Sequence, residues 1–69
     1  MKDPVKICYR NHRGEVGLRL ITPIEIWFGR TQWHEGNQWL LKAHDHNKDA
    51  VRDFALQDVY GWFKQKESK

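Results

Sequence analysis

Short runs in which apolar and polar residues alternate recur along this chain, and turn-forming residues separate them. The first run covers residues 5–10, and every second residue in it is apolar. A period of two is typical of a β-strand with one buried face. Residues 11–15 contain Asn and Gly, which favour a tight turn, and the alternation resumes over residues 16–22. The sequence therefore predicts an antiparallel β-hairpin at the N-terminus.

Further short strands are expected over residues 24–28, 38–45 and 51–56. Pro23 cannot donate a backbone hydrogen bond, so we expect a bend, a bulge or an edge position there. Residues 29–37 are bounded by glycine and asparagine and predict the longest irregular stretch. The polar run His44–Asp49 (HDHNKD) between two apolar runs is interpreted as the turn of a hairpin.

Strands of this length and spacing, with almost no helix, predict a mainly β fold, a small five-stranded antiparallel SH3-like barrel that is partly open. A short C-terminal helical turn is expected near residues 57–60, although the spacing of apolar residues over 56–66 also permits a longer helix. The expected organisation is an N-terminal tail at 1–4, the barrel at 5–60 and a basic C-terminal tail at 61–69.

Charge, cysteine content and hydropathy bear on the partners and the location that we expect for the protein. The net charge is +3, but the lysines of residues 64–69 supply most of it, so charge alone gives little support for a polyanionic partner. Cys8 is the single cysteine and cannot form an internal disulfide, which favours a reducing, cytoplasmic location. We find no apolar run long enough to span a membrane, so no membrane partner is expected.

The polar residues suggest two kinds of chemistry, metal binding by histidines and catalysis by the cysteine, and the sequence favours neither. His44 and His46 lie two apart and can face one metal ion, but the further ligands that zinc needs have no regular spacing, so no metal or other cofactor is predicted. Cys8 lies in mid-strand, away from any helix N-terminus that would activate its thiol. We therefore expect a protein that is not an enzyme.

Arginines on three different expected strands form the most informative set. They can meet on one face of the sheet beside aromatic side chains, an arrangement that suits a ligand with a phosphate and a base. The residues are Tyr9, Arg10, Arg19, Trp27, Trp33 and Arg52. The alternative is that each arginine pairs with an acid on a neighbouring strand, such as Glu15, Glu25 or Asp53.

Over nearly all of its length the chain also resembles a WYL domain, a small module of bacterial transcriptional regulators. The pieces that carry the resemblance are Ile7-Cys8-Tyr9-Arg10, Arg19 with Ile21-Thr22-Pro23, Trp39-Leu40-Leu41-Lys42-Ala43 and Arg52-Asp53-Phe54-Ala55-Leu56. They follow the family's order over residues 5–60. Two departures stand out: Leu40 replaces the tyrosine of the naming triplet, and Asp58 stands where the family has an arginine.

The resemblance implies a diverged, stand-alone SH3-like or Sm-like domain that binds a nucleotide or single-stranded nucleic acid in transcription regulation. Its implied ligand-binding residues are Tyr9, Arg10, Arg19 and Arg52. The alternative function is a protein–protein interaction module, acting as a homo-oligomer or on an effector protein. It would use the aromatic side chains of residues 27–39, chiefly Trp27 and Trp33.

Overall fold

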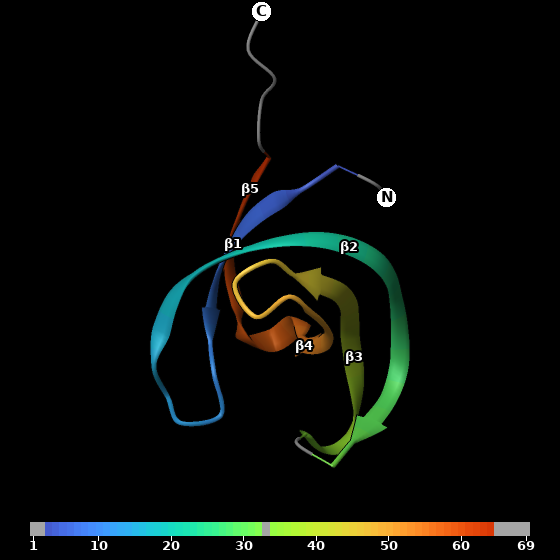
Figure 1. The fold of residues 1–69 in the computed structure, drawn as a ribbon. Coiled ribbons are helices and arrows are strands. Elements are labelled where there is room, and N and C mark those ends of the chain that lie inside the picture. Colours follow the sequence, from blue (N-terminus) through green and yellow to red (C-terminus); the bar gives the residue numbers. More distant parts are fainter. Residues whose placement is uncertain (1–2, 33, 65–69) are drawn as a thin grey trace, which may run out of the picture.

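The computed structural model describes residues 3–32 and 34–64 and confirms the mainly β prediction (Figure 1). Five antiparallel strands form one sheet in the order β4-β3-β2-β1-β5. The elements are β1 (Val5–Arg10), β2 (Val16–Thr31), β3 (His34–Asp45), β4 (Ala50–Ala55), the 3₁₀-helix η1 (Leu56–Asp58) and β5 (Val59–Lys64). β2 arches over the molecule from β1 to β3, so the sheet curls around its own core. Because the two outer strands β4 and β5 do not pair with each other, the barrel stays open.

The N-terminal hairpin is formed as predicted. β1 pairs with the first part of β2, from Val5 opposite Ile21 to Arg10 opposite Val16. The turn between them depends on Asn11, whose side-chain oxygen accepts hydrogen bonds from the backbone N–H groups of Arg13 and Glu15, each at 2.9 Å. Gly14 adopts a φ of 85° in this turn, a conformation that glycine takes without steric strain.

Strand β2 is longer than the sequence predicted. The expected strands 16–22 and 24–28 are one continuous strand, which runs on to Thr31. Pro23 lies at a shift in the pairing with β3, where the register moves between Pro23 and Glu25. This is the bulge that the proline predicted, and it bends β2 without ending it. The irregular stretch expected over residues 29–37 was wrong, because strands β2 and β3 occupy most of it.

The bulge decides which aromatic side chain of β2 is buried. Trp27 is half-buried, whereas Phe28 is 55 % exposed. Trp27 lies opposite Leu40, and a Cβ atom on Gly29 would overlap its ring, so the indole packs over the glycine. Phe28 lies opposite Trp39, which is also exposed.

The C-terminal region differs most from expectation. The helical turn is present as η1, but the residues after it form β5, which pairs with β1. The alternative of a longer helix over 56–66 is therefore wrong. Residues 61–64, expected in the basic tail, continue β5 to Lys64, and residues 65–69 lie outside the described part of the chain.

The core lies on the concave face of the curled sheet. Four strands contribute side chains to it, and Leu56 and Val59 pack against it from the C-terminal side. The core residues are Val5, Ile7, Tyr9, Ile21, Leu41, Ala43 and Phe54. The ring of Phe54 meets that of Tyr9 edge to face, with the centroids 4.8 Å apart, so β4 contacts β1 across the concave face. None of the helices in residues 3–32 and 34–64 has the length and apolar character needed to cross a membrane.

Candidate functional site

The polar run at the end of β3 forms the predicted hairpin turn. Asp45 is only 1 % exposed, and its carboxylate accepts a hydrogen bond from the backbone N–H of Asn47 at 2.9 Å. The turn is fastened to β2, because the N–H of His46 donates to the carbonyl of Leu20 at 2.9 Å and the N–H of Leu20 donates to the Asn47 side chain at 3.2 Å. The turn therefore has a structural role.

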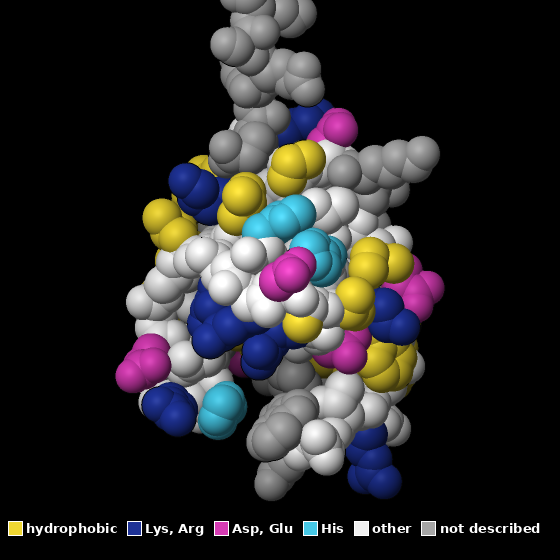
Figure 2. All heavy atoms as spheres, in the orientation of Figure 1, with side chains coloured by type: hydrophobic (Ala, Val, Ile, Leu, Met, Phe, Trp, Pro, Cys, Tyr) yellow, Lys and Arg dark blue, Asp and Glu magenta, His cyan; other side chains and the backbone are white. Residues whose placement is uncertain are grey.

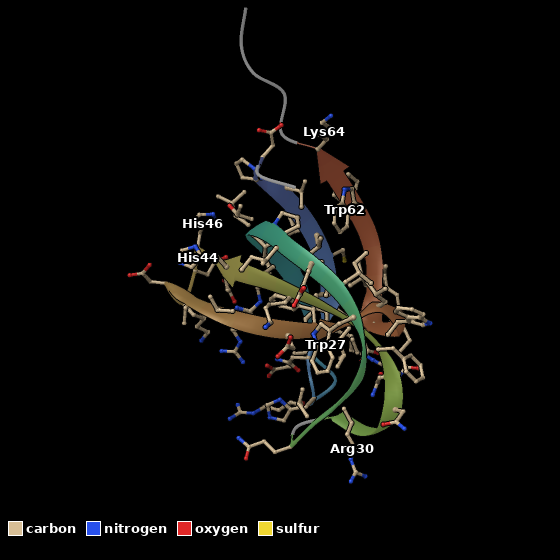
Figure 3. All side chains as sticks on the ribbon, turned by 90° about the vertical axis from the view of Figure 1, so that its right-hand side faces the viewer. Trp27, Arg30, His44, His46, Trp62 and Lys64 are labelled. Carbon is tan, nitrogen blue, oxygen red and sulfur yellow. The ribbon has the colours of Figure 1, made fainter. Side chains whose placement is uncertain are left out.

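The two histidines beside this turn are engaged in the same hairpin. His44 lies 3.2 Å from Asp49, and His46 is hydrogen-bonded to Thr22 at 2.7 Å. Their rings meet edge to face, and Figure 3 shows the pair together on one side of the molecule. Within the described residues no group of three or more His, Cys, Asp or Glu side chains could hold a metal ion.

A hollow lies on the concave face, beyond the apolar core. Its volume is about 490 Å³, within the range of small-molecule pockets. Strands β1, β2 and β4, the β1–β2 turn and the end of β3 supply most of its lining. The lining residues are Tyr9, Asn11, His12, Arg19, Thr31, Asp45, Ala50, Val51, Arg52, Asp53 and Phe54. Figure 2 shows basic side chains gathered near the middle of the face that it presents.

Three of the four predicted ligand-binding residues meet in this pocket: Tyr9, Arg19 and Arg52. The strand register explains why. Arg19 lies opposite Ile7 and Arg52 lies opposite Ala43, so both arginines share the concave face with the core. Tyr9 is 9 % exposed and forms the boundary between core and pocket.

The charges in the pocket are unequally compensated. Arg19 lies 3.9 Å from the buried carboxylate of Asp45, so its charge is partly offset. The carboxylate of Asp53 accepts a hydrogen bond from the indole N–H of Trp27 at 2.9 Å. Within the described part of the chain Arg52 forms no ion pair with any acid, so its positive charge is available to a ligand.

The Tyr9 hydroxyl stays protonated over the physiological range. Burial raises its pKa above the ordinary value of 10.0, and the charge of Asp58 adds to this. A hydrogen bond with the backbone of Ala55 and the charges of Arg52 and Arg19 act in the opposite direction. A neutral phenol beside two guanidinium groups can donate a hydrogen bond to an anion.

The fourth predicted residue, Arg10, lies elsewhere. Its guanidinium donates to Asp58 at 2.8 Å and lies 6.0 Å from the ring centre of Tyr60. The hydrogen bond to Asp58 raises the pKa of Arg10 above its usual value. The expected alternative of arginine–acid pairs is therefore correct for Arg10, although the partner is Asp58 and not one of the acids considered.

The predicted interaction residues have different surroundings. Trp27 is half-buried, and its indole is held by Asp53, as described above. Figure 3 shows Trp27 on the arch of β2, away from His44 and His46. Trp33 lies outside the described residues. The exposed aromatic pair of this region is Phe28 with Trp39, whose ring centres are 5.2 Å apart.

Sequence reasoning missed several residues that line the pocket. Asp45 is the most important of them, because it is buried and faces Arg19. Its position two residues after Ala43 places it on the inward side of β3, which is a signal that the sequence contains. His12 lies in the β1–β2 turn and Thr31 at the end of β2, in a segment that was expected to be irregular, so no periodic pattern marks either residue.

Comparison of the chain with protein-family models, with curated proteins and with solved structures found no match.

Proposed function

We propose that this domain is a non-enzymatic regulatory module that binds a nucleotide, free or within single-stranded nucleic acid, in the pocket on its concave face. The observation that carries the proposal is Arg52, a cation in the pocket lining without an ion-pair partner among the described residues. Guanidinium groups bind phosphate with two parallel hydrogen bonds. The resemblance to WYL domains supports the same class of ligand.

The pocket has chemically distinct parts that suit such a ligand. Arg52 and the Tyr9 hydroxyl can contact a phosphate, and Arg19 adds positive charge that Asp45 partly offsets. Tyr9 and Phe54, whose rings meet edge to face, belong to the apolar part of the lining, against which a base can lie. A volume of about 490 Å³ suits one nucleotide unit.

The test is a binding titration with two probes, cyclic AMP and a short mixed-sequence single-stranded DNA, at low and at moderate salt. Arg52→Gln is expected to weaken binding of the preferred probe about tenfold, because a charge-assisted hydrogen bond is lost. The matched control is Arg10→Gln, which removes the same charge outside the pocket and should leave the affinity unchanged. Equal affinities for the parent chain and Arg52→Gln would contradict the proposal.

A second candidate function is a protein–protein contact through the aromatic residues of the β2–β3 hairpin. It is favoured by Phe28 and Trp39, which are 55 % and 56 % exposed and lie next to Ile26, itself 49 % exposed. Exposed apolar groups of this kind often mark an interface. Association of the chain with itself or with another protein that persists at high salt and is lost in Trp39→Ser would support this candidate over the nucleotide pocket.

A further inference from the structure

The two outer strands of the sheet are protected from pairing with another chain to very different degrees. β4 carries adjacent charges, Arg52 and Asp53, in the middle of the strand, and charged side chains are a common protection of sheet edges. β5 has no charged residue from Val59 to Phe63, and Lys64 is its first. Its outer side pairs with no strand among the described residues. Figure 3 shows β5, with Trp62 and Lys64, along the right-hand margin of the molecule.

This unprotected strand also exposes aromatic side chains. Tyr60 is 57 % exposed, Trp62 is 46 % exposed and Phe63 is 54 % exposed. Aromatic side chains bury about 150–250 Å² each, so roughly 300 Å² of ring surface faces solvent along one short strand. Tyr60 and Trp62 share one face of the strand and Phe63 lies on the other, so exposed rings flank the free edge of β5 on both faces.

We propose that β5 of two copies of this chain pair antiparallel about a two-fold axis, joining the two sheets into one. The reason is the distribution of charge along the strand. Asp58 stands immediately before β5 and Lys64 at its end. Antiparallel pairing centred on Gly61 places Lys64 of each copy opposite Asp58 of the other, whereas parallel pairing would place like charges together.

The same register suits the apolar residues. Tyr60 lies opposite Trp62, Val59 lies opposite Phe63, and Gly61 lies opposite itself. The ring of Phe63 already folds over Gly61, since a Cβ atom there would come within 2.9 Å of it. Two glycines at the axis leave room for the rings on either side. Asp58, which Arg10 holds at 2.8 Å, would then interact with cations from both copies.

Dimer formation through β5 leaves the concave pocket open. No residue of β5 lines that pocket, whose walls come from β1, β2, β3, β4 and the β1–β2 turn. Each dimer would therefore present two independent pockets. Because the contact is one strand edge with a few rings, its area lies at the low end of specific interfaces. We expect monomer and dimer to exchange in the micromolar range of concentration.

The test is sedimentation equilibrium of the chain at low salt, from micromolar to millimolar concentration. The expected result is a species of twice the 8.3 kDa monomer mass. Lys64→Glu places a glutamate opposite Asp58 of the other copy at both ends of the paired strands. The resulting repulsion should raise the dissociation constant of the dimer about tenfold. Lys48→Glu, in the exposed β3–β4 turn, makes the same change of charge and should have no effect.

Circular dichroism verifies that both variants keep the fold of the parent chain. A chain that stays monomeric at millimolar concentration would overturn the proposal. A dimer that Lys64→Glu and Lys48→Glu affect equally would also overturn it, because the register about Gly61 requires a specific effect at Lys64. Neither result bears on the nucleotide pocket, so the two proposals can fail separately.

Discussion

Replacing Tyr9 and Phe54 with leucine, singly and together, tests the curl of the sheet. Two strands, β2 and β3, separate β1 from β4 in the sheet order. In a flat sheet three strand spacings would therefore hold the two residues about 14 Å apart. In the curled sheet their ring centres are 4.8 Å apart with an interplanar angle of 89°.

The expected size of the coupling follows from this geometry. An edge-to-face pair of rings contributes about 0.5–1.5 kcal/mol beyond the area that each ring buries. We therefore expect the double variant to lose about 1 kcal/mol less free energy of unfolding than the two single losses added together. A domain of this size has a total stability on the order of 3–10 kcal/mol, so the coupling is measurable.

The assay is urea unfolding of the parent chain, the two single variants and the double variant, followed by far-ultraviolet circular dichroism. The control combines Tyr9→Leu with Ile24→Ala, since Ile24 is 46 % exposed and lies seven residues along β2 from Gly17, the residue opposite Tyr9. That pair should be additive. Additivity of the Tyr9 and Phe54 substitutions to within about 0.3 kcal/mol would refute the contact between β1 and β4.

Three further substitutions test local features of the fold. Burial raises the pKa of Tyr9 above 10.0, so with rising pH the unfolded chain loses the Tyr9 proton before the folded chain does. The free energy of unfolding should therefore fall as the pH rises from about 10 to the folded pKa. Tyr9→Phe should reduce this fall, measured by unfolding titrations at alkaline pH. Gly14→Ala should cost about 1 kcal/mol in urea unfolding because φ is 85° there, whereas Gly17→Ala, in ordinary strand backbone, should not destabilise. Trp27→Phe should cost about 1 kcal/mol in the same assay, because the hydrogen bond to Asp53 is lost. An equal loss in an Asp53→Ala background, where the side chain has no acceptor, would exclude that explanation.

Alternation of apolar and polar residues was sufficient to predict much of the fold. β1 has the bounds that its alternating run predicted, because one of its faces is buried and the other half-exposed. The bend at Pro23 was also predictable, since a proline without an N–H donor between two apolar runs favours a bulge. The count of five strands was right, but two expected strands are one, and β5 was not expected.

The errors arose where local residue preferences oppose the pairing of strands. Gly29, Gly36 and Gly61 were taken as breaks, whereas strands run through all three positions. Gly29 and Gly61 instead give room to the rings of Trp27 and Phe63. Long-range pairing overrides the weak local signal of a glycine, and no single-sequence pattern shows that a partner strand is near.

Part of the pocket lining was predictable from the alternation of residues along the strands. Tyr9, Arg19 and Arg52 face one side because of strand parity, which the alternating pattern contains. Parity also separates Arg10 from Tyr9, because successive residues of a strand point to opposite faces. The distance between Arg19 and the buried Asp45 depends on the curl of β2, which the sequence pattern does not describe.

The most direct test of the proposed nucleotide pocket is a two-dimensional amide NMR titration of the labelled chain. Short single-stranded DNA and then cyclic AMP are added at low and at moderate salt. We predict that the shifts cluster at Tyr9, Arg19 and Arg52 and decrease as salt is raised. Shifts centred instead on Arg10 and the residues around it, or no shifts with either probe, would contradict the assignment of the concave pocket as the binding site.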